Sequence, residues 1–411
     1  MIAKKLVCMT CKKEYDIGPM FDGCPDCRQR GVVSPVEVVY DYNAVKAGLD
    51  LSAWLTAPRS IWKYRDLLPL SDPAHAVTLG EGGTPLVQIR TLNEASGLES
   101  LYVKNETCNP TWSFKDRQNA VSVSMARELG FKKVTTSTTG NQGVSTAAYA
   151  AAAGLECAVF CHPEAPRLQH DLIRFYGARS VSLKDRKQFL STLVRDYGFF
   201  PCTGLTPLPV ASPFGIEGYK TISYEIVMQL NGRVPDRIYA PVAGGHGIYG
   251  IYKGFRELKA LSVVDRIPRM FGCQAEGCNP YVRSFQARQR EVTTVKNPST
   301  IALSIRDETG GDCGLRAIYD SDGAALDVSD PEIIRTAGLL ARGGVAAEPA
   351  SVAPVACALQ AARAGQIGPR ELVVCFVTGT AAKWPEALDR MVKEPIIHNP
   401  NFEELKLALW L

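Results

Sequence analysis

A lysine stands at the start of a predicted helix, in the run Asn109-Pro110-Thr111-Trp112-Ser113-Phe114-Lys115-Asp116-Arg117. Both a helix N-terminus and burial disfavour a positive charge, so Lys115 in that place would lose its proton more readily than an exposed lysine. A neutral amine is the nucleophile that Schiff-base chemistry needs. The spacing alone favours a surface lysine beside Asp116.

Three other segments place glycines or hydroxyls where strands end. The segment Ser137-Thr138-Thr139-Gly140-Asn141-Gln142-Gly143 precedes an Ala-rich helix, and its free amides and hydroxyls suit an amino-acid carboxylate. By the same physics, Ala243-Gly244-Gly245-His246-Gly247 predicts a phosphate-binding loop, although its spacing is not the GxGxxG of dinucleotide sites. The segment Val377-Thr378-Gly379-Thr380 follows an apolar strand, at the end where α/β proteins bind ligands. Read singly, each segment also fits an ordinary turn.

Four of the 13 cysteines, Cys8, Cys11, Cys24 and Cys27, form two CxxC pairs separated by twelve residues. This spacing is typical of a zinc ribbon, in which four thiolates fill the coordination shell and leave no open position for catalysis. We therefore expect a structural metal site in a segment too small to hold a core of its own. A nucleic-acid-binding ribbon is the alternative, but the nearby basic residues are balanced by acidic ones.

The elements that must position these residues alternate along the chain. Strands are predicted at 101–103, 133–136, 157–161, 180–183, 237–241, 269–274 and 372–377. Helices are predicted at 116–129, 143–153, 167–176, 219–229, 248–258, 331–340 and 351–363. Short apolar strands alternating with helices indicate an α/β fold with parallel-type sheets flanked by helices.

Composition limits the class of protein. The chain has 411 residues, of which 46% are apolar and 21% charged, with a net charge of +4. These values exclude collagen-like and largely disordered chains, and they give no reason to expect a nucleic acid or a membrane surface as a partner. We expect a cytoplasmic protein with reduced thiols, because no secretory signal precedes the cysteines.

Taken in order, the segments resemble the threonine synthase branch of the pyridoxal-phosphate enzymes of fold type II, the tryptophan synthase β family. The resemblance covers roughly residues 79 to 383. The matching runs are Glu81-Gly82-Gly83-Thr84-Pro85-Leu86, Lys104-Asn105-Glu106 through Arg117, Gly140-Asn141, Glu217-Gly218-Tyr219-Lys220-Thr221, Gly244–Gly247, Glu348-Pro349-Ala350-Ser351 and Thr378-Gly379.

The resemblance implies a role for each site residue. Lys115 would form the Schiff base with pyridoxal 5'-phosphate and move protons, with Phe114 beside it. Asn141 would bind the phenolic oxygen of the cofactor, and Thr378 would face its pyridine nitrogen. The cofactor phosphate would lie on Gly244, Gly245, His246 and Gly247. The substrate carboxylate would lie on Thr138, Thr139, Gly140, Asn141 and Gln142.

Two departures from the family pattern bear on the substrate. Trp112 stands where the family has glycine, and Gly215 stands where threonine synthases carry an arginine that grips the substrate phosphate. The main hypothesis is a lyase or replacement enzyme acting on an amino acid with a side-chain leaving group. A cysteate synthase-like enzyme using O-phosphoserine, a non-catalytic cofactor-binding relative and a nucleotide-dependent Rossmann enzyme stay open as alternatives.

The resemblance also implies an organisation. We expect a zinc-ribbon segment at 1–35, a large cofactor-binding lobe at 36–120 and 210–411, and a small lobe at 121–209. The expected partners are a small amino-acid substrate and a second copy of the chain in a homodimer.

Overall fold

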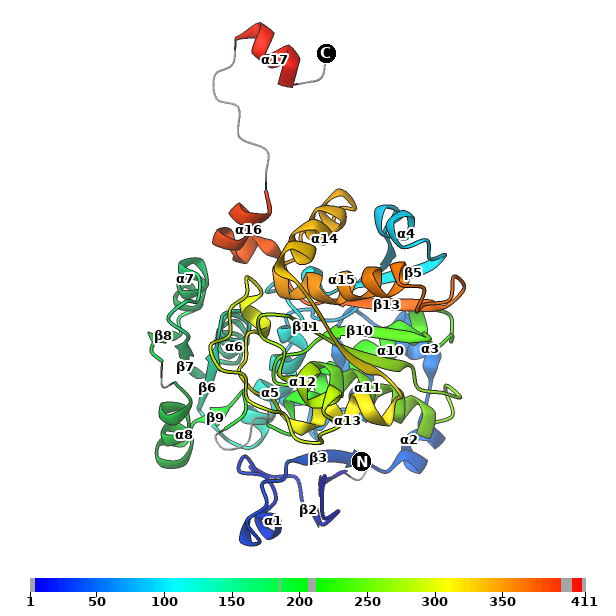
Figure 1. Ribbon diagram of the computed structural model, residues 1–411. Helices are drawn as coiled ribbons and strands as arrows, with labels where there is room; N and C mark the ends of the chain where they lie inside the picture. Colours follow the sequence, from blue (N-terminus) through cyan, green and yellow to red (C-terminus); the bar gives the residue numbers. More distant parts are fainter. Residues whose placement is uncertain (1–3, 185, 206–211, 393–400, 409–411) are drawn as a thin grey trace.

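The computed structural model describes residues 4–184, 186–205, 212–392 and 401–408, and its largest sheet has six strands in the order β12-β11-β10-β13-β5-β4 (Figure 1). Neighbouring strands are parallel except at the edge, where β4 runs antiparallel to β5. The strands are β4 Leu86–Gln88, β5 Ser100–Asn105, β10 Arg237–Pro241, β11 Arg269–Ala275, β12 Ala324–Val328 and β13 Leu372–Val377.

Helices cover both faces of this sheet. Val374 and Phe376 of β13 point into the core that includes α11 (His246–Ala260) and α13 (Asp312–Asp320). Val373 and Cys375 point into the opposite core, which includes α4 (Arg90–Ser96), α14 (Asp330–Arg342) and α15 (Pro349–Arg363). Because side chains alternate along a strand, a strand covered on both faces is apolar throughout, as β13 is.

A second sheet has four parallel strands in the order β8-β7-β6-β9. Its strands are β6 Lys133–Thr138, β7 Glu156–Cys161, β8 Arg179–Ser182 and β9 Phe200–Pro201. The helices along this part of the chain are α5 Lys115–Glu128, α6 Asn141–Ala153, α7 Arg167–Phe175 and α8 Arg186–Tyr197. Together the two sheets confirm the predicted α/β fold with parallel-type sheets and flanking helices.

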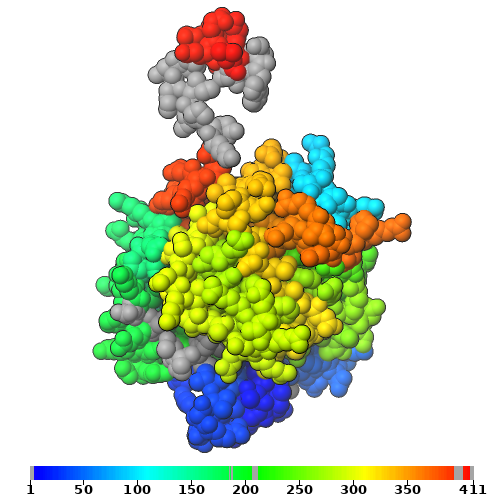
Figure 2. All heavy atoms as spheres, viewed as in Figure 1, coloured from blue at the N-terminus to red at the C-terminus, as the bar shows by residue number. Residues whose placement is uncertain are grey.

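The N-terminal segment forms a third sheet of antiparallel strands, β1 (Lys4–Cys8), β2 (Glu14–Tyr15) and β3 (Val36–Tyr40), with α1 at Pro25–Gln29. Figure 2 shows this segment, in blue, lying against one end of the body. Buried polar contacts attach it there: the Glu37 carboxylate accepts a 2.7 Å hydrogen bond from the Tyr249 hydroxyl, and Lys253 donates to the carbonyl of Val38 at 2.5 Å. The sheet thus includes residues beyond 35, and the division into three domains stays a prediction.

The remaining elements connect these layers. They are α2 Tyr42–Gly48, α3 Leu51–Thr56, η1 Ile61–Leu67, η2 Pro73–His75, η3 Glu106–Cys108, α9 Gly215–Tyr219, α10 Thr221–Gln229, α12 Pro280–Gln286, η4 Leu303–Ile305, η5 Ala381–Lys383, α16 Pro385–Met391 and α17 Phe402–Ala408. Within the ranges given above, no helix is long and apolar enough to cross a membrane.

The predicted elements lie where the sequence indicated, with two kinds of difference. The helix expected at 219–229 is divided into α9 and α10 around Lys220. The elements that were not predicted include strands β4, β9 and β12 and helices α4, α8, α12 and α13. β4 has only three residues and lies at a sheet edge, so it carries no clear alternation of apolar and polar residues.

A buried ion network holds α5 to the rest of the fold. The Arg117 guanidinium makes paired hydrogen bonds of 2.7 to 2.9 Å to the carboxylates of Glu106 and Glu225. Lys104 donates to Glu225 at 2.7 Å, and all four side chains are almost completely buried. The network joins β5, η3, α5 and α10, and Arg117 at its centre lies two residues after Lys115.

We expect Arg117→Gln to lower the free energy of unfolding by about 3–5 kcal/mol, because it leaves two buried carboxylates with Lys104 as their only cation in the network. Denaturant unfolding measures the change. Arg90→Gln, at an exposed helix position, is the matched control and should change the free energy by less than about 0.5 kcal/mol. Equal effects of the two substitutions would contradict a central role for Arg117.

Candidate active site

A cavity of about 380 Å³ lies where strands of both sheets end. Thr138 ends β6, Pro241 ends β10 and Thr378 directly follows β13, and all three line the cavity. The carboxyl ends of parallel strands are the usual place for a ligand in α/β folds. The predicted residues that line it are Phe114, Lys115, Thr138, Thr139, Asn141, Gln142, Gly244, Gly245, His246, Gly247 and Thr378.

Lys115 is the first residue of α5 and supplies a partly buried amine to this cavity. Its Nζ donates a 3.0 Å hydrogen bond to the Tyr219 hydroxyl and lies 4.5 Å from the centre of the Phe114 ring. Burial lowers the pKa of Lys115 to about 8, although the negative charges of Asp307 and Glu348 oppose the shift. A larger fraction of the amine is therefore neutral near pH 7 than for an exposed lysine.

The glycine loop at the start of α11 has the geometry of an anion cradle. Gly245 adopts φ +89°, and a Cβ there would lie 2.5 Å from the Tyr281 hydroxyl oxygen. A Cβ at Gly247 would lie 3.2 Å from the Phe114 ring. The backbone amides lie at the N-terminus of a 15-residue helix, whose dipole favours negative charge.

Thr378 is oriented by Ser351, for which the sequence suggested no role. The Ser351 hydroxyl oxygen accepts hydrogen bonds from the amides of Thr378 and Gly379, at 3.1 and 2.8 Å. With both lone pairs engaged, Ser351 can donate its hydrogen to the Thr378 hydroxyl oxygen 2.6 Å away or to a Glu348 carboxylate oxygen 3.4 Å away, and it cannot accept from Thr378. The hydrogen of Thr378 is then available to a ring nitrogen in the cavity.

Asn141 is held by Glu348, a second residue to which the sequence gave no role. The Asn141 amide nitrogen lies 2.9 and 3.0 Å from the two carboxylate oxygens of Glu348. Burial raises the pKa of Glu348 above its ordinary value. The carbonyl oxygen of Asn141 is buried without a hydrogen-bond partner among the described residues, as is that of Gln142. Both residues line the cavity, so a bound ligand could supply the missing hydrogen bonds.

Of the predicted substrate-binding residues, Gly140 is the one that does not line the cavity. A Cβ at Gly140 would lie 2.1 Å from the Gln169 side-chain oxygen, so the glycine is needed for close packing behind the cavity wall. Its amide donates to the Thr138 hydroxyl at 2.7 Å and thereby orients that side chain. Its predicted contact with a substrate carboxylate stays a prediction.

Trp112 does not obstruct the cavity. Its backbone has φ +61°, a left-handed conformation that glycine adopts without strain, and its side chain is 43% exposed. Trp112 is not among the residues that line the cavity. The departure from the family glycine therefore leaves the site open.

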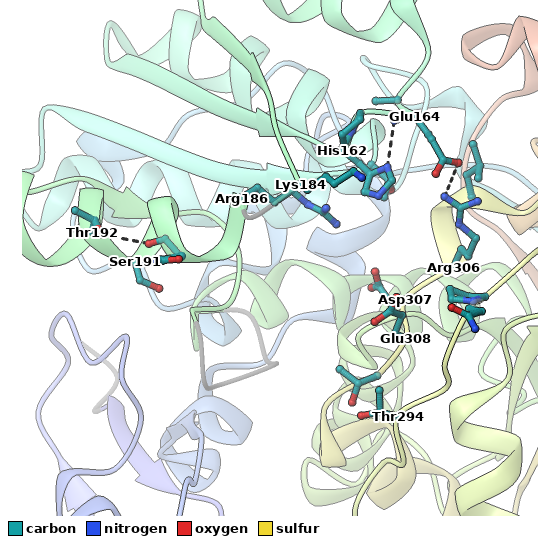
Figure 3. Close-up of a pocket in the computed structure, with 18 of the residues that line it drawn as sticks. His162, Glu164, Lys184, Arg186, Ser191, Thr192, Thr294, Arg306, Asp307 and Glu308 are labelled. Atoms are coloured by element: carbon teal, nitrogen blue, oxygen red, sulfur yellow. Dashed lines mark hydrogen bonds and ion pairs between the residues drawn. The ribbon is translucent and has the colours of Figure 1, made fainter.

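A larger cavity, of about 1240 Å³, adjoins the first and shares Thr139, Arg186, Asp307 and Thr309 with it (Figure 3). Several charged residues line it, and some are already paired: Arg306 binds Glu164 at 2.6 Å and Arg195 binds Asp22 at 2.7 Å. The larger cavity therefore lies next to the cavity that Lys115 lines.

The four N-terminal cysteines lie together, away from this cavity. Their Sγ atoms are all within 4.8 Å of one another, and the distances Cys8–Cys27 and Cys11–Cys24 are both 3.7 Å. A tetrahedral zinc ion with Zn–S bonds of about 2.3 Å places its sulfurs about 3.8 Å apart. The amides of Thr10 and Cys11 donate to the sulfur of Cys8, which suits a thiolate. The donor set therefore fits a tetrahedral metal ion.

The site combines the Lys115 amine, the glycine loop at the start of α11 and the Thr378 hydroxyl, all at the strand ends of an α/β fold. This combination is that of a cofactor-dependent enzyme of fold type II. The chain belongs to the family described as pyridoxal-phosphate dependent enzymes, whose model matches residues 77–379. It is 37% identical to a threonine synthase of Methanocaldococcus jannaschii and 36% identical to one of Methanosarcina acetivorans, with 98% of each chain covered. The predicted class, a pyridoxal-phosphate-dependent lyase related to threonine synthases, is confirmed.

Solved structures share the fold. A threonine deaminase isoform from Solanum lycopersicum superposes with a TM-score of 0.65 at 19% identity, covering 81% of this chain and 95% of that one. A pyridoxal 5'-phosphate-dependent aspartate racemase superposes with a TM-score of 0.63 at 24% identity, covering 74% and 92%. These likenesses confirm the predicted fold type II.

The cavity residues fit the cofactor of this family. The glycine cradle suits a phosphate, Lys115 offers the amine, and Thr378 and Asn141 offer unused hydrogen-bonding capacity toward a ring. When bound, pyridoxal phosphate supplies an electron sink for charge that develops at the substrate Cα.

We expect the cofactor-free protein to capture pyridoxal phosphate faster as the pH rises through about 8, because Lys115 loses its proton in that range. Stopped-flow absorbance from pH 6 to 10 measures the rate. Lys115→Ala should abolish the absorbance band of the bound cofactor, whereas Lys132→Ala, at an exposed position, should retain it. A band that survives Lys115→Ala would show that another amine is the attachment point.

We expect one zinc ion per chain, held by Cys8, Cys11, Cys24 and Cys27. Elemental analysis of the purified protein measures the metal, and an iron-thiolate spectrum would reveal iron instead. Cys24→Ser should remove the ion and lower the melting temperature, whereas Cys108→Ser, an exposed cysteine outside the cluster, should do neither. Metal content that is unchanged in Cys24→Ser would contradict this ligand set.

Proposed function

We propose that this enzyme catalyses the reaction of a threonine synthase: it removes a side-chain leaving group from an activated amino acid and adds water to give threonine. The observation that carries the proposal is that a partly buried amine and two separate anion-binding loops line one cavity. One loop suits the cofactor phosphate and the other the substrate carboxylate. The threonine synthase relatives, which match the chain over 98% of its length, support the same reaction.

Each side chain has a part in this proposal. Lys115, in its neutral form, which its lowered pKa makes more accessible than for an exposed lysine, removes the proton from the substrate Cα and returns a proton later in the reaction. Thr138, Thr139 and the amides at the start of α6 bind the substrate carboxylate. Asn141 and Thr378 orient the cofactor ring, and Glu348 and Ser351 position these two residues. The Tyr219 hydroxyl accepts a hydrogen bond from the Lys115 amine and orients it when the amine is free.

We propose further that the four-cysteine cluster binds zinc structurally, since four thiolates leave no open coordination position. A homodimer and a cytoplasmic location are also part of the proposal. Thirteen free cysteines in the absence of disulfides among the described residues fit a reducing compartment. A net charge of +4 over 411 residues gives no support for a nucleic-acid or membrane partner.

The test is a substrate screen with the cofactor-loaded protein, measuring phosphate release and amino-acid products. O-phosphohomoserine should give threonine and phosphate in equal amounts, and Lys115→Ala should lose this turnover while Lys132→Ala retains it. Product from O-phosphoserine and sulfite, without threonine from O-phosphohomoserine, would favour the cysteate synthase-like alternative. A protein that binds the cofactor but exchanges no Cα proton of any amino acid tested in deuterated water would be the non-catalytic relative.

A further inference from the structure

An arginine does not fit at residue 215, where the resemblance to threonine synthases implies one that binds the substrate phosphate. Gly215 is buried in α9, and a Cβ there would lie 2.8 Å from Cγ of Gln118 and 3.2 Å from the Ser122 hydroxyl. Gln118 is fixed in place, because its side-chain nitrogen donates to the carbonyl of Cys202 at 2.5 Å and its oxygen accepts from the Tyr219 hydroxyl. The room for a longer side chain is therefore already taken.

Another guanidinium does reach the cavity. Of the described lysines and arginines, Lys115 and Arg186 alone line the smaller cavity, and Arg186 lines the larger one as well. Lys115 is engaged with Tyr219. The Nε atom of Arg186 is buried and has no hydrogen-bond partner among the described residues. A buried guanidinium nitrogen without an acceptor is costly unless a ligand supplies one.

The surroundings of Arg186 favour an anion on its side of the cavity. Figure 3 shows Arg186 and Asp307 approaching from opposite walls, Arg186 from the start of α8. The negative charge of Asp307 disfavours an anionic ligand group next to that residue. Thr139 and Thr309, which line both cavities with Arg186, add neutral hydroxyl donors. The other two arginines of the larger cavity, Arg195 and Arg306, already have carboxylate partners.

We propose that Arg186 binds the anionic leaving group of the substrate, a phosphate monoester, and so determines specificity from the four-stranded sheet instead of from α9. This inference rests on the proposed function, because it assigns a binding group to the same substrate. A guanidinium binds phosphate through two parallel hydrogen bonds, so both charge and planar shape contribute.

The test compares ligands with and without the charged group. The probes are 2-amino-5-phosphonopentanoate and norvaline, which lacks the phosphonate, with binding to the cofactor-loaded protein followed by calorimetry. Arg186→Gln should weaken phosphonate binding about 10- to 100-fold, as expected for the loss of a charged hydrogen-bonded pair, and leave norvaline binding unchanged. Arg186→Lys keeps the charge but loses the planar guanidinium, so its affinity for the phosphonate should lie between those of the wild type and Arg186→Gln. Arg179→Gln, the same change at an exposed position on β8, is the matched control.

Two results would overturn the inference. Equal weakening of both probes would mean that Arg186 supports the cavity without recognising the anion. Loss of pyridoxal phosphate binding in Arg186→Gln would mean that the residue serves the cofactor phosphate instead of the substrate.

The outcome is separable from that of the proposed function. The wild type could make no threonine from O-phosphohomoserine and still bind the phosphonate more tightly than norvaline, with that preference lost in Arg186→Gln. The assignment of Arg186 would then hold and the proposed reaction would fail. If threonine forms and Arg186→Gln raises the KM for O-phosphohomoserine no more than Arg179→Gln does, the reaction holds and the assignment of Arg186 fails.

Discussion

The position of the reactive amine depends on the buried guanidinium of Arg117. Its two carboxylate partners come from η3 and α10, and hydroxyls of Thr84 and Thr221 accept from the same guanidinium at 3.1 and 3.0 Å. Burying this many charges is tolerable because each has a close partner of opposite sign. Since Arg117 lies in the first turn of α5, the network fixes the start of the helix and therefore the place of Lys115.

Several charged residues of the sequence motifs thus hold the fold together and take no part in the chemistry of the site. Glu217 accepts hydrogen bonds from Lys220, Lys253 and Tyr40, which connects α9 and α11 to strand β3 of the N-terminal sheet. Asp116 similarly accepts from Ser145 of α6, at 2.6 Å. These acids belong to conspicuous sequence runs but lie outside the cavity wall. They join separate elements so that the residues between them reach the site.

The sequence was sufficient for the parts of the fold and site that depend on local pattern. Alternating apolar runs predicted the central strands, and glycines beside strand ends predicted the loop at Gly244–Gly247. Ser351 and Glu348 could not be assigned roles in this way, because each acts on a residue far away in the chain: Ser351 is hydrogen-bonded to Thr378, and Glu348 to Asn141. Arg186 could not be assigned one either, because no motif marks it and only folding places it in the cavity wall. Such pairs become visible only when packing brings helices and strand ends together. The edge strand β4 was too short to carry a pattern.

The glycine at 215 is physically linked to Gln118 through the contact between α5 and α9. Gln118 fills the space beside residue 215 and accepts a hydrogen bond from Tyr219, whose own hydroxyl accepts from Lys115. The Gln118 side chain therefore leaves room only for glycine at 215. The same side chain also orients the Lys115 amine through Tyr219. A cation for an anionic substrate must then come from another wall, and the start of α8 is the wall that offers one. Binding through Arg186 would tie the substrate to the four-stranded sheet, so that substrate affinity and the spacing between the two sheets would depend on each other.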